Sequence, residues 1–312
     1  MRIALINSGI GLLAAAAEVH RLRPDADLVL AMDPDGMPWG PRTPDDIAQR
    51  SLACARAAAA FQPDVLVFAC NTGTVHALPA LRAEFEPGMP VVGTVPAIKP
   101  AAAFSDSVAI WATVATTASA YQRQLIADFA GSARVTPIAC PGLADAVDAG
   151  DEAAARAAVT DAASRTPADC GAVVLGCTEY ELAAGLIGAA LPNVTLFRSA
   201  AAVAAQALRR TAAAGTDAGP PPAPSRAGTV RVLLSGRQAG LPEAALRYAE
   251  GRLLADLVVA DERPADDERP EDDRAADDER PAGERPGDER RDDERAEDDE
   301  VTRPVPPPSV PA

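Results

Sequence analysis

Apolar runs of strand length alternate with alanine-rich stretches along most of the chain, and this alternation constrains the fold more than any other feature. The runs at 65–69 and 172–175 are apolar at every position, as in strands that helices cover on both faces. Alternating strands and helices are typical of parallel sheets, so we predict an α/β fold with mainly parallel sheets. Eight runs are expected to be strands: RIALIN, DLVLAM, DVLVFAC, VVGTV, SVAIWA, RVTPIA, AVVLGC and VTLF, at residues 2–7, 27–32, 64–70, 91–95, 107–112, 134–139, 172–177 and 194–197.

The eight predicted strands fall into two sets of four, separated near Lys99, the single lysine of the chain. A length of 312 residues favours about two domains, so the two sets are expected to form two similar halves. A proline-rich stretch at 216–226 then links the second half to a further predicted strand at 230–236. A closing helix is expected over residues 242–257 and would complete the folded part of the chain.

The C-terminal part, residues 258–312, differs in composition from the rest. Residues 261–300 contain 21 acidic side chains, 8 arginines and three DERP repeats, and they carry most of the formal net charge of −16. Almost no apolar side chain is available there for burial, so we expect a disordered acidic and proline-rich tail. Its role would be to keep the protein in solution or to tether a basic partner of unknown identity. Acidic and basic residues nearly balance before the tail, and no basic stripe predicts nucleic-acid binding.

Cysteine, histidine and lysine usage limits the chemistry. Five widely spaced cysteines without a CxxC pair indicate reduced thiols in a cytoplasmic protein rather than disulfides or a zinc site. A single lysine and two histidines argue against pyridoxal chemistry and against a metal site, so no cofactor and no metal are expected. No apolar run approaches the roughly 18 residues that are needed to span a membrane. We therefore expect a cytoplasmic protein without a membrane segment.

Polar residues and thiols stand at the expected ends of four strands, at Asn7, Cys70, Thr113 and Cys177. Ligands of open α/β sheets bind where the carboxyl ends of strands lead into helices. A cysteine at the N-terminus of a helix also lies at the positive end of the helix dipole, which favours the thiolate. The repeated pattern of an apolar run, a cysteine and small polar residues therefore predicts two reactive thiols at one ligand site. The other three cysteines are expected to be packing residues, namely Cys54, Cys140 and Cys170.

Seven short motifs lie in an order and spacing that resemble the cofactor-independent aspartate/glutamate racemases, and the glutamate racemases above all. They are NSGIG, PWGPR, CNTGT, VPAIKP, ATVATTASAY, ACP and GCTEY, which begin at residues 7, 38, 70, 95, 112, 139 and 176. The resemblance extends from Met1 to about Leu257. It implies two pseudo-symmetric α/β domains, residues 1–98 with 208–257 and residues 99–207, with the active site in the cleft between them.

The resemblance implies racemisation of an amino acid by two cysteines. Inverting the Cα centre requires removal of a weakly acidic proton on one face and delivery of another proton on the opposite face. Cys70 and Cys177 are then the alternating base and acid, with Glu179 and Asn7 as their catalytic neighbours. Hydroxyl and backbone N–H groups can stabilise the enolate-like charge without a metal. The substrate-binding residues that the resemblance implies are Ser8, Trp39, Gly40, Asn71, Thr72, Thr113, Thr116, Thr178 and Asp148.

Both catalytic neighbours depart from the usual motifs of glutamate racemases. Those enzymes usually carry Asp in a DSG motif and His in a GCTH motif, where this chain has Asn7 and Glu179. Asn7 can form hydrogen bonds but cannot accept a proton, so we expect slow catalysis on the Cys70 face and a faster Asn7→Asp variant. A carboxylate is kept at Asp148, where the family tends to place a glutamate.

The motifs favour a cofactor-independent enzyme that interconverts L- and D-glutamate and supplies D-glutamate for peptidoglycan. One alternative is a racemase for aspartate or another acidic amino acid, because Glu179 after GCT is more typical of aspartate racemases. The other is a non-catalytic relative that binds an acidic metabolite, although a pure binder would have no chemical reason to keep both thiols. The expected partner is a small acidic amino acid. A homodimer is compatible with the sequence, and neither nucleic acid nor a membrane is expected as a partner.

Overall fold

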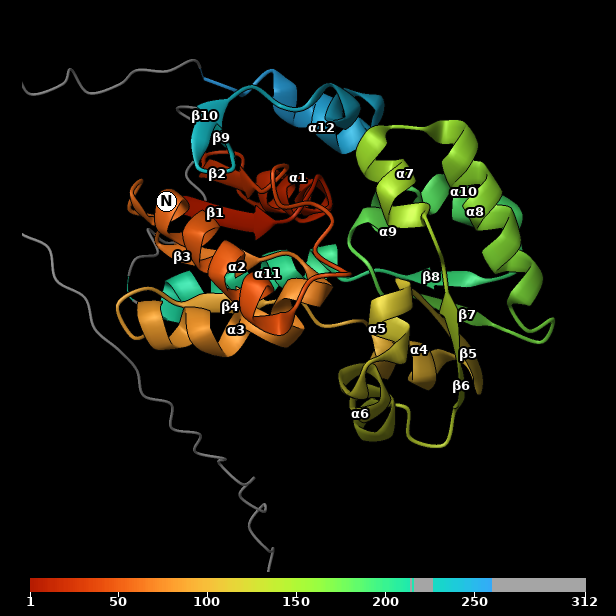
Figure 1. Ribbon diagram of the computed structural model, residues 1–312. Helices are drawn as coiled ribbons and strands as arrows, with labels where there is room; N and C mark the ends of the chain where they lie inside the picture. The colour runs from red at the N-terminus through yellow and green to blue at the C-terminus, as the bar shows by residue number, and fades with distance from the viewer. Residues whose placement is uncertain (214, 216–226, 260–312) are drawn as a thin grey trace, which may run out of the picture. The chain divides into compact units, whose positions relative to one another are not determined.

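The computed structural model describes residues 1–213, 215 and 227–259 (Figure 1). The expected proline-rich link at 216–226 and almost all of the expected tail lie outside the described residues. Two residues that the sequence assigns to the tail lie inside them. Val258 pairs with Val230 in a parallel bridge, and the Val259 amide donates to the Val230 carbonyl at 3.0 Å. These two residues therefore extend the packed chain beyond the expected boundary.

The first sheet has six strands in the order β10-β9-β2-β1-β3-β4, and only β10 runs antiparallel to its neighbour. Alternate residues of β1 reach two different core clusters: Ile3 and Leu5 one, Ala4 and Ile6 the other. Burial of both faces explains why β1, β2 and β3 are apolar at almost every position. The bounds are β1 Arg2–Asn7, β2 Asp27–Met32, β3 Val65–Phe68, β4 Val91–Gly93, β9 Val230–Leu234 and β10 Arg237–Ala239.

Helices cover both faces of the first sheet (Figure 1). One face packs against α1 (Leu12–Leu22), α11 (Ala200–Ala213) and α12 (Ala249–Ala255). The other face packs against α2 (Pro44–Ala59) and α3 (Asn71–Phe85). The chain thus returns to the first sheet through α11, after it has formed the second sheet.

The C-terminal end of the first sheet differs from the sequence prediction. β9 lies within the expected strand, but β10 turns back on it through Ser235 and Gly236, which both have positive φ. The single helix expected over 242–257 is divided into the 3-10 helix η1 (Glu243–Arg247) and α12, because Tyr248 between them has an extended backbone. The helical periodicity of the sequence does not predict this break at Tyr248.

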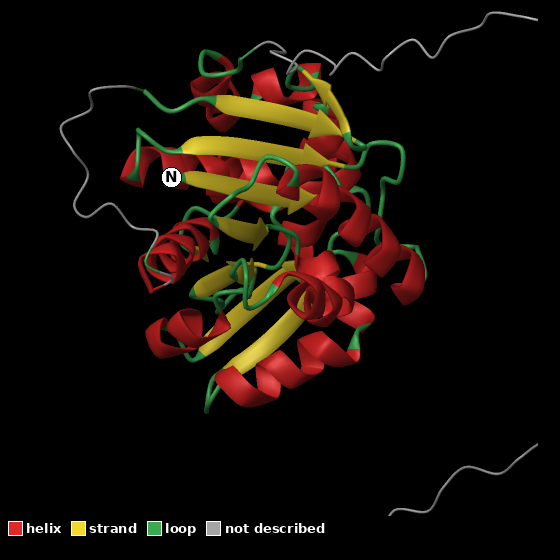
Figure 2. Cartoon of the chain, turned by 90° about the vertical axis from the view of Figure 1, so that its left-hand side faces the viewer, coloured by secondary structure: helices red, strands yellow, loops and turns green. Residues whose placement is uncertain are grey.

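The second sheet has four parallel strands in the order β6-β5-β7-β8 (Figure 2). Helices α4 and α6 cover one face, and α7, α8 and α10 cover the other. The strands are β5 Ser107–Ala112, β6 Arg134–Ala139, β7 Ala172–Leu175 and β8 Thr195–Phe197. The helices are α4 Ile98–Phe104, α5 Val114–Ala118, α6 Ala120–Phe129, α7 Leu143–Ala149, α8 Glu152–Arg165, α9 Glu179–Leu182 and α10 Ala184–Ala190.

The predicted α/β class with mainly parallel sheets is confirmed. One apolar cluster continues from a face of the first sheet onto a face of the second, so the two sheets share part of their core. The boundaries that we expect for two domains stay a prediction. Within the described residues, no helix is both long enough and apolar enough to cross a membrane.

Candidate active site

A cavity of about 390 Å³ lies among loops that follow strands of both sheets. The loops after β1 and β3 contribute Ser8 and Cys70, and the loops after β5 and β7 contribute Thr113 and Cys177. Both predicted thiols therefore line one cavity, although they are far apart in the sequence. The predicted site residues in its wall are Ser8, Trp39, Gly40, Cys70, Asn71, Thr72, Thr113, Asp148, Cys177 and Glu179.

Three predicted residues stand behind this wall and contact residues that are in or next to it. Asn7 is fully buried, and its amide donates hydrogen bonds to the Ala69 carbonyl at 2.7 Å and to Thr178 Oγ1 at 3.1 Å. Thr116 accepts a hydrogen bond from the Thr113 hydroxyl at 3.0 Å. Asn7, Thr116 and Thr178 are thus placed to orient wall residues rather than to form the wall themselves.

The cavity also has wall residues that the sequence does not predict. The ACP motif at 139–141 indicates that the loop after β6 belongs to the site. The sequence prediction nevertheless assigns Cys140, the cysteine of this motif, to packing alone. The structure places Cys140 both in the apolar core and in the cavity wall. The unpredicted wall residues are Met37, Pro38, Pro41, Val114, Ala115, Cys140, Pro141, Gly142, Ala144 and Asp145.

Cys70 is the N-cap residue of α3, and its Sγ accepts a hydrogen bond from the Gly73 amide at 3.3 Å. Burial and, to a smaller extent, the nearby charge of Glu179 raise the pKa of the Cys70 thiol to about 12. Hydrogen bonds from Gly73 and Ser8 act in the opposite direction. The expectation that the helix N-terminus favours a thiolate is therefore outweighed, because desolvation of a buried anion is the larger effect.

Cys177 follows β7, and its thiol donates a hydrogen bond to Glu179 Oε2 at 2.8 Å. Burial raises the pKa of Cys177 well above its usual value, and the charge of Glu179 adds to this effect. Glu179 is itself buried and also accepts a hydrogen bond from the Thr178 hydroxyl at 3.3 Å. A carboxyl oxygen is therefore in place to receive the thiol proton of Cys177.

Acidic side chains dominate the charge of the cavity. Asp145, Asp148 and Glu179 line it, whereas no lysine, arginine or histidine does so among the described residues. Burial and the charge of Glu179 raise the pKa of Asp148 well above its usual value, against the hydrogen bond that the Ile10 amide donates to its Oδ1 at 2.9 Å. A protonated Asp148 would reduce the repulsion between these groups. Carboxylates of a bound molecule would consequently be held by hydroxyl and N–H groups.

Asn71 leaves one hydrogen-bonding atom without a partner. Its Nδ2 donates to the Gly176 carbonyl at 2.7 Å, and since a carbonyl can only accept, this contact determines the orientation of the amide. Its Oδ1 is buried and has no hydrogen-bond partner among the described residues. An unpaired buried acceptor is costly, so this oxygen is suited to an N–H donor such as the ammonium group of an amino acid.

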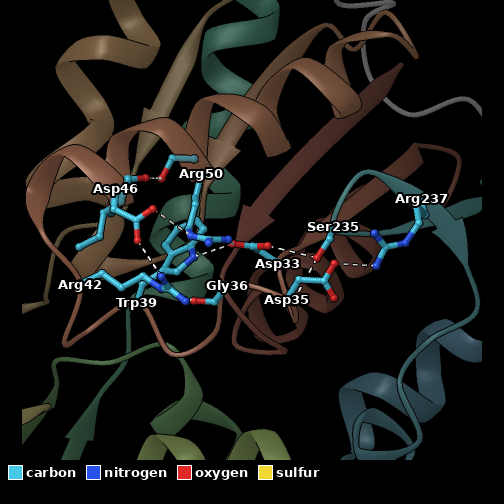
Figure 3. Close-up of polar contacts among 11 residues, drawn as sticks. Asp33, Asp35, Gly36, Trp39, Arg42, Asp46, Arg50, Ser235 and Arg237 are labelled. Atoms are coloured by element: carbon cyan, nitrogen blue, oxygen red, sulfur yellow. Dashed lines mark hydrogen bonds and ion pairs between the residues drawn. The ribbon is translucent and has the colours of Figure 1, made fainter.

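Trp39 forms part of the wall and is held in place by Asp33 (Figure 3). Its indole Nε1 donates to Asp33 Oδ2 at 3.0 Å, and Arg50 contacts the same oxygen at 3.3 Å. The other oxygen, Oδ1, accepts a hydrogen bond from the Ser235 hydroxyl at 3.1 Å. Asp33 thereby connects the cavity wall to α2 and to the turn between β9 and β10.

A close approach at Gly36 keeps the 33–42 loop compact around Asp33. A Cβ atom on Gly36 would lie 1.9 Å from Asp33 Oδ2 and 2.4 Å from Arg50 Nη1. The sequence predicts Trp39 and Gly40 at the site but contains no local signal for Asp33 as their support. Within the described residues, no group of three or more His, Cys, Asp or Glu side chains could hold a metal ion.

Comparison with known proteins shows the family to which the chain belongs. The family profile described as Asp/Glu/Hydantoin racemase matches residues 7–207. The glutamate racemase of Pseudomonas putida (strain W619) is 37% identical over 220 residues, which cover 68% of this chain and 82% of that protein. The glutamate racemase of Herpetosiphon aurantiacus is 36% identical over 218 residues, with 68% and 85% of the two chains covered.

A solved structure shows the same likeness in three dimensions. The Escherichia coli glutamate racemase, crystallised with L-glutamate and the activator UDP-MurNAc-ala, matches with a TM-score of 0.66 at 27% sequence identity. The match covers 79% of this chain and 91% of that protein. The CNTGT and GCTEY motifs, which contain Cys70 and Cys177, both lie inside the residues that the family profile matches.

Proposed function

The chain belongs to the Asp/Glu/hydantoin racemase family and is an isomerase, and from this premise we propose that it interconverts L- and D-glutamate with two thiols and no cofactor. One observation carries the proposal: Cys70 and Cys177 line the same cavity, each after a strand of a different sheet. A base and an acid on opposite faces of one Cα atom are what racemisation requires.

The proton transfers follow from the contacts of Cys177. Glu179 accepts the thiol proton of Cys177 through their 2.8 Å hydrogen bond, and the Cys177 thiolate then removes the Cα proton from one face. Cys70 delivers its own thiol proton to the opposite face. This step leaves Cys70 as the thiolate, Cys177 as the thiol and Glu179 still holding the proton that it accepted, and these together are the starting state for the other enantiomer.

Binding of the substrate lowers the cost of forming a thiolate in a buried site. The ammonium group of the amino acid is expected to donate to Asn71 Oδ1, which has no partner in the wall. A positive charge close to the thiols favours the thiolate form and opposes the effect of burial. Hydroxyl groups of Ser8, Thr72 and Thr113 line the same cavity and are proposed to donate to the substrate carboxylates.

We place this reaction in the cytoplasm, with D-glutamate as a precursor for peptidoglycan. The likeness to glutamate racemases supports this role. The five cysteines Cys54, Cys70, Cys140, Cys170 and Cys177 are all free thiols, which supports a reducing compartment.

A second candidate is the racemisation of aspartate or another acidic amino acid by the same chemistry. Glu179 favours it, because glutamate racemases usually carry histidine at this position. A non-catalytic relative is the third candidate, and the contact between the Cys177 thiol and Glu179 opposes it because a binder needs no proton acceptor there.

Proton exchange at Cα distinguishes the three candidates. The purified protein is incubated in deuterium oxide with L-glutamate, L-aspartate and a panel of other amino acids, and the loss of the Cα proton signal is followed by NMR. Circular dichroism of the product reports inversion. The proposal expects exchange and inversion of glutamate, the second candidate expects aspartate or another amino acid to react faster, and absence of exchange with every substrate overturns both.

A further inference from the structure

We propose that Asn7 and Asn71 form an amide brace, defined as these two side-chain amides, which fixes the two thiol-bearing loops relative to each other. In this brace Asn7 is a positioning residue that acts by donating hydrogen bonds. It does not take the place of a catalytic acid or base. The inference rests on the proposed racemisation, because the brace matters for catalysis only if both thiols act on one substrate.

Asn71 ties the loop of the first thiol to the loop of the second. It follows Cys70 directly, and its Nδ2 donates to the carbonyl of Gly176, which directly precedes Cys177, at 2.7 Å. Asn71 is 3% exposed, so water does not compete for this contact. The bond therefore limits how far the two thiols can move apart.

Asn7 ties the same loops together on the other side of each thiol. Its Nδ2 donates to the carbonyl of Ala69, directly before Cys70, at 2.7 Å and to the hydroxyl of Thr178, directly after Cys177, at 3.1 Å. Both hydrogen atoms of the amide are used in this way. Ala69, Gly176 and Thr178, which flank the two thiols, thus each accept a hydrogen bond from one of the two amides. The fourth flanking residue is Asn71 itself.

The contact with Thr178 extends the effect of Asn7 to the proton acceptor. Thr178 accepts from Asn7 and donates its own hydroxyl hydrogen to Glu179 Oε2 at 3.3 Å, the oxygen that receives the Cys177 thiol hydrogen bond. A directed series of donors therefore runs from Asn7 through Thr178 to Glu179. Loss of the first donor would leave the Thr178 hydroxyl free to turn.

An aspartate at position 7 would break the brace. An ionised carboxyl group has no hydrogen to donate, and it would face the Ala69 carbonyl oxygen, which lies only 2.7 Å from Asn7 Nδ2. Position 7 also lies close to Glu179, because both side chains surround Gly11. A Cβ atom on Gly11 would be only 2.7 Å from Asn7 Nδ2 and 2.5 Å from Glu179 Oε1. Two buried carboxylates would then repel each other. A neutral asparagine at position 7 is therefore compatible with a carboxyl group at position 179, whereas an aspartate is not. We now expect Asn7→Asp to be slower than the parent, in contrast to the faster variant expected from the sequence.

The test compares Asn7→Asp with Asn193→Asp, the same change at an exposed asparagine. For Asn7→Asp we expect kcat to fall about 10²-fold in both directions with a much smaller change in KM, since thiols displaced by about 1 Å act less well on a bound substrate. We also expect faster alkylation of Cys70 and Cys177 by iodoacetamide, measured for each peptide by mass spectrometry. Asn193→Asp should change neither quantity.

A second variant covers the case in which Asn7→Asp does not fold, as judged by circular dichroism. Thr178→Val keeps the side-chain shape but removes the hydroxyl that accepts from Asn7, and it should raise the alkylation rate of Cys177 more than that of Cys70. If both variants keep the parent kcat and the parent alkylation rates, the brace is overturned. If the parent itself racemises no amino acid, the proposed function fails, and the alkylation rates still decide whether the brace exists.

Discussion

The two thiols occupy equivalent places after strands of two sheets, yet their surroundings differ. Cys70 caps the 15-residue helix α3 and accepts a hydrogen bond from Gly73, whereas Cys177 precedes the four-residue helix α9 and donates to Glu179. Among the described residues, no carboxyl oxygen has a hydrogen bond with Cys70. A hydrogen bond to a carboxyl group is therefore present at Cys177 and absent at Cys70 among the described residues.

The difference cannot make the enzyme one-directional. Enantiomers have equal free energy, so kcat/KM must be equal in the two directions for the parent and for every variant. The asymmetry should instead appear in the response of each thiol to pH, to alkylation and to the loss of its neighbours.

The largest effect is expected when either thiol is removed. Cys70→Ala and Cys177→Ala should each lower the rate of racemisation by about 10² to 10⁴, because each variant lacks the acid or the base of one face. Optical rotation follows the reaction, and circular dichroism confirms the fold. Cys54→Ala is the matched control, since Cys54 is a buried cysteine outside the cavity wall. Near-parent rates in either cavity variant would refute the two-thiol mechanism.

The second prediction concerns the pH dependence of alkylation at Cys70. Its pKa is raised to about 12, so the reactive thiolate should increase about tenfold for each pH unit, or about 10³-fold between pH 7 and pH 10. An ordinary thiol with a pKa of about 8.5 would instead reach a plateau above about pH 9.5. Iodoacetamide labelling of the Cys70 peptide at each pH measures the rate, with circular dichroism as a check on the fold. A plateau that is reached at or below about pH 10 would contradict the role of burial at this thiol.

The third prediction separates the two faces by removing a neighbour of each thiol. Glu179→Gln keeps the shape of the side chain but cannot take a proton, so kcat/KM should fall about 10²-fold in both directions. Ser8→Ala removes a hydroxyl beside Cys70 that favours its thiolate, and the loss should be about tenfold or less. Steady-state kinetics with both enantiomers measure the two variants. Equal losses would show that the Cys177 face has no special proton acceptor.

The smallest effect is expected from the support of the cavity wall on the Cys70 side. Asp33→Asn weakens the contacts with Trp39, Arg50 and Ser235, and KM should rise about tenfold while kcat changes little. Asp35→Asn is the control, because Asp35 pairs with Arg237 at the exposed surface. Substrate titrations followed by kinetics give both constants. An unchanged KM in Asp33→Asn would mean that Trp39 keeps its position without this hydrogen bond.

Sequence patterns predicted the main features of the fold because those features depend on local chemistry. All eight expected strands are present, since short apolar runs between helices pair into a sheet wherever one forms, although the edge strands β6 and β8 are only partly buried. Pattern reasoning failed at β10 and at the break in the closing helix, because both depend on turns and contacts that lie outside any periodic segment.

The sequence predicted which residues lie at the candidate site but not which contacts each of them makes there. Short motifs indicated Cys70, Cys177 and Asn71, and the structure places all three in one cavity wall. The sequence predicts Asn7 beside Cys70 as a side chain that forms hydrogen bonds but cannot accept a proton, and the structure identifies its partners as a carbonyl and a hydroxyl far along the chain. No local pattern reports a hydrogen bond between residues 171 positions apart.

The sequence by itself determined that this chain forms mainly parallel α/β sheets with a cysteine after the third expected strand of each set of four, because strand periodicity and strand-end chemistry are local properties. Only the tertiary structure decided how deeply both thiols are buried and which distant groups lie near them, such as Ser8 and Glu179 near Cys70. The physical reason is that a pKa and a hydrogen bond depend on burial and on the distance to neighbouring charges. Those quantities arise only when segments far apart in the sequence pack together.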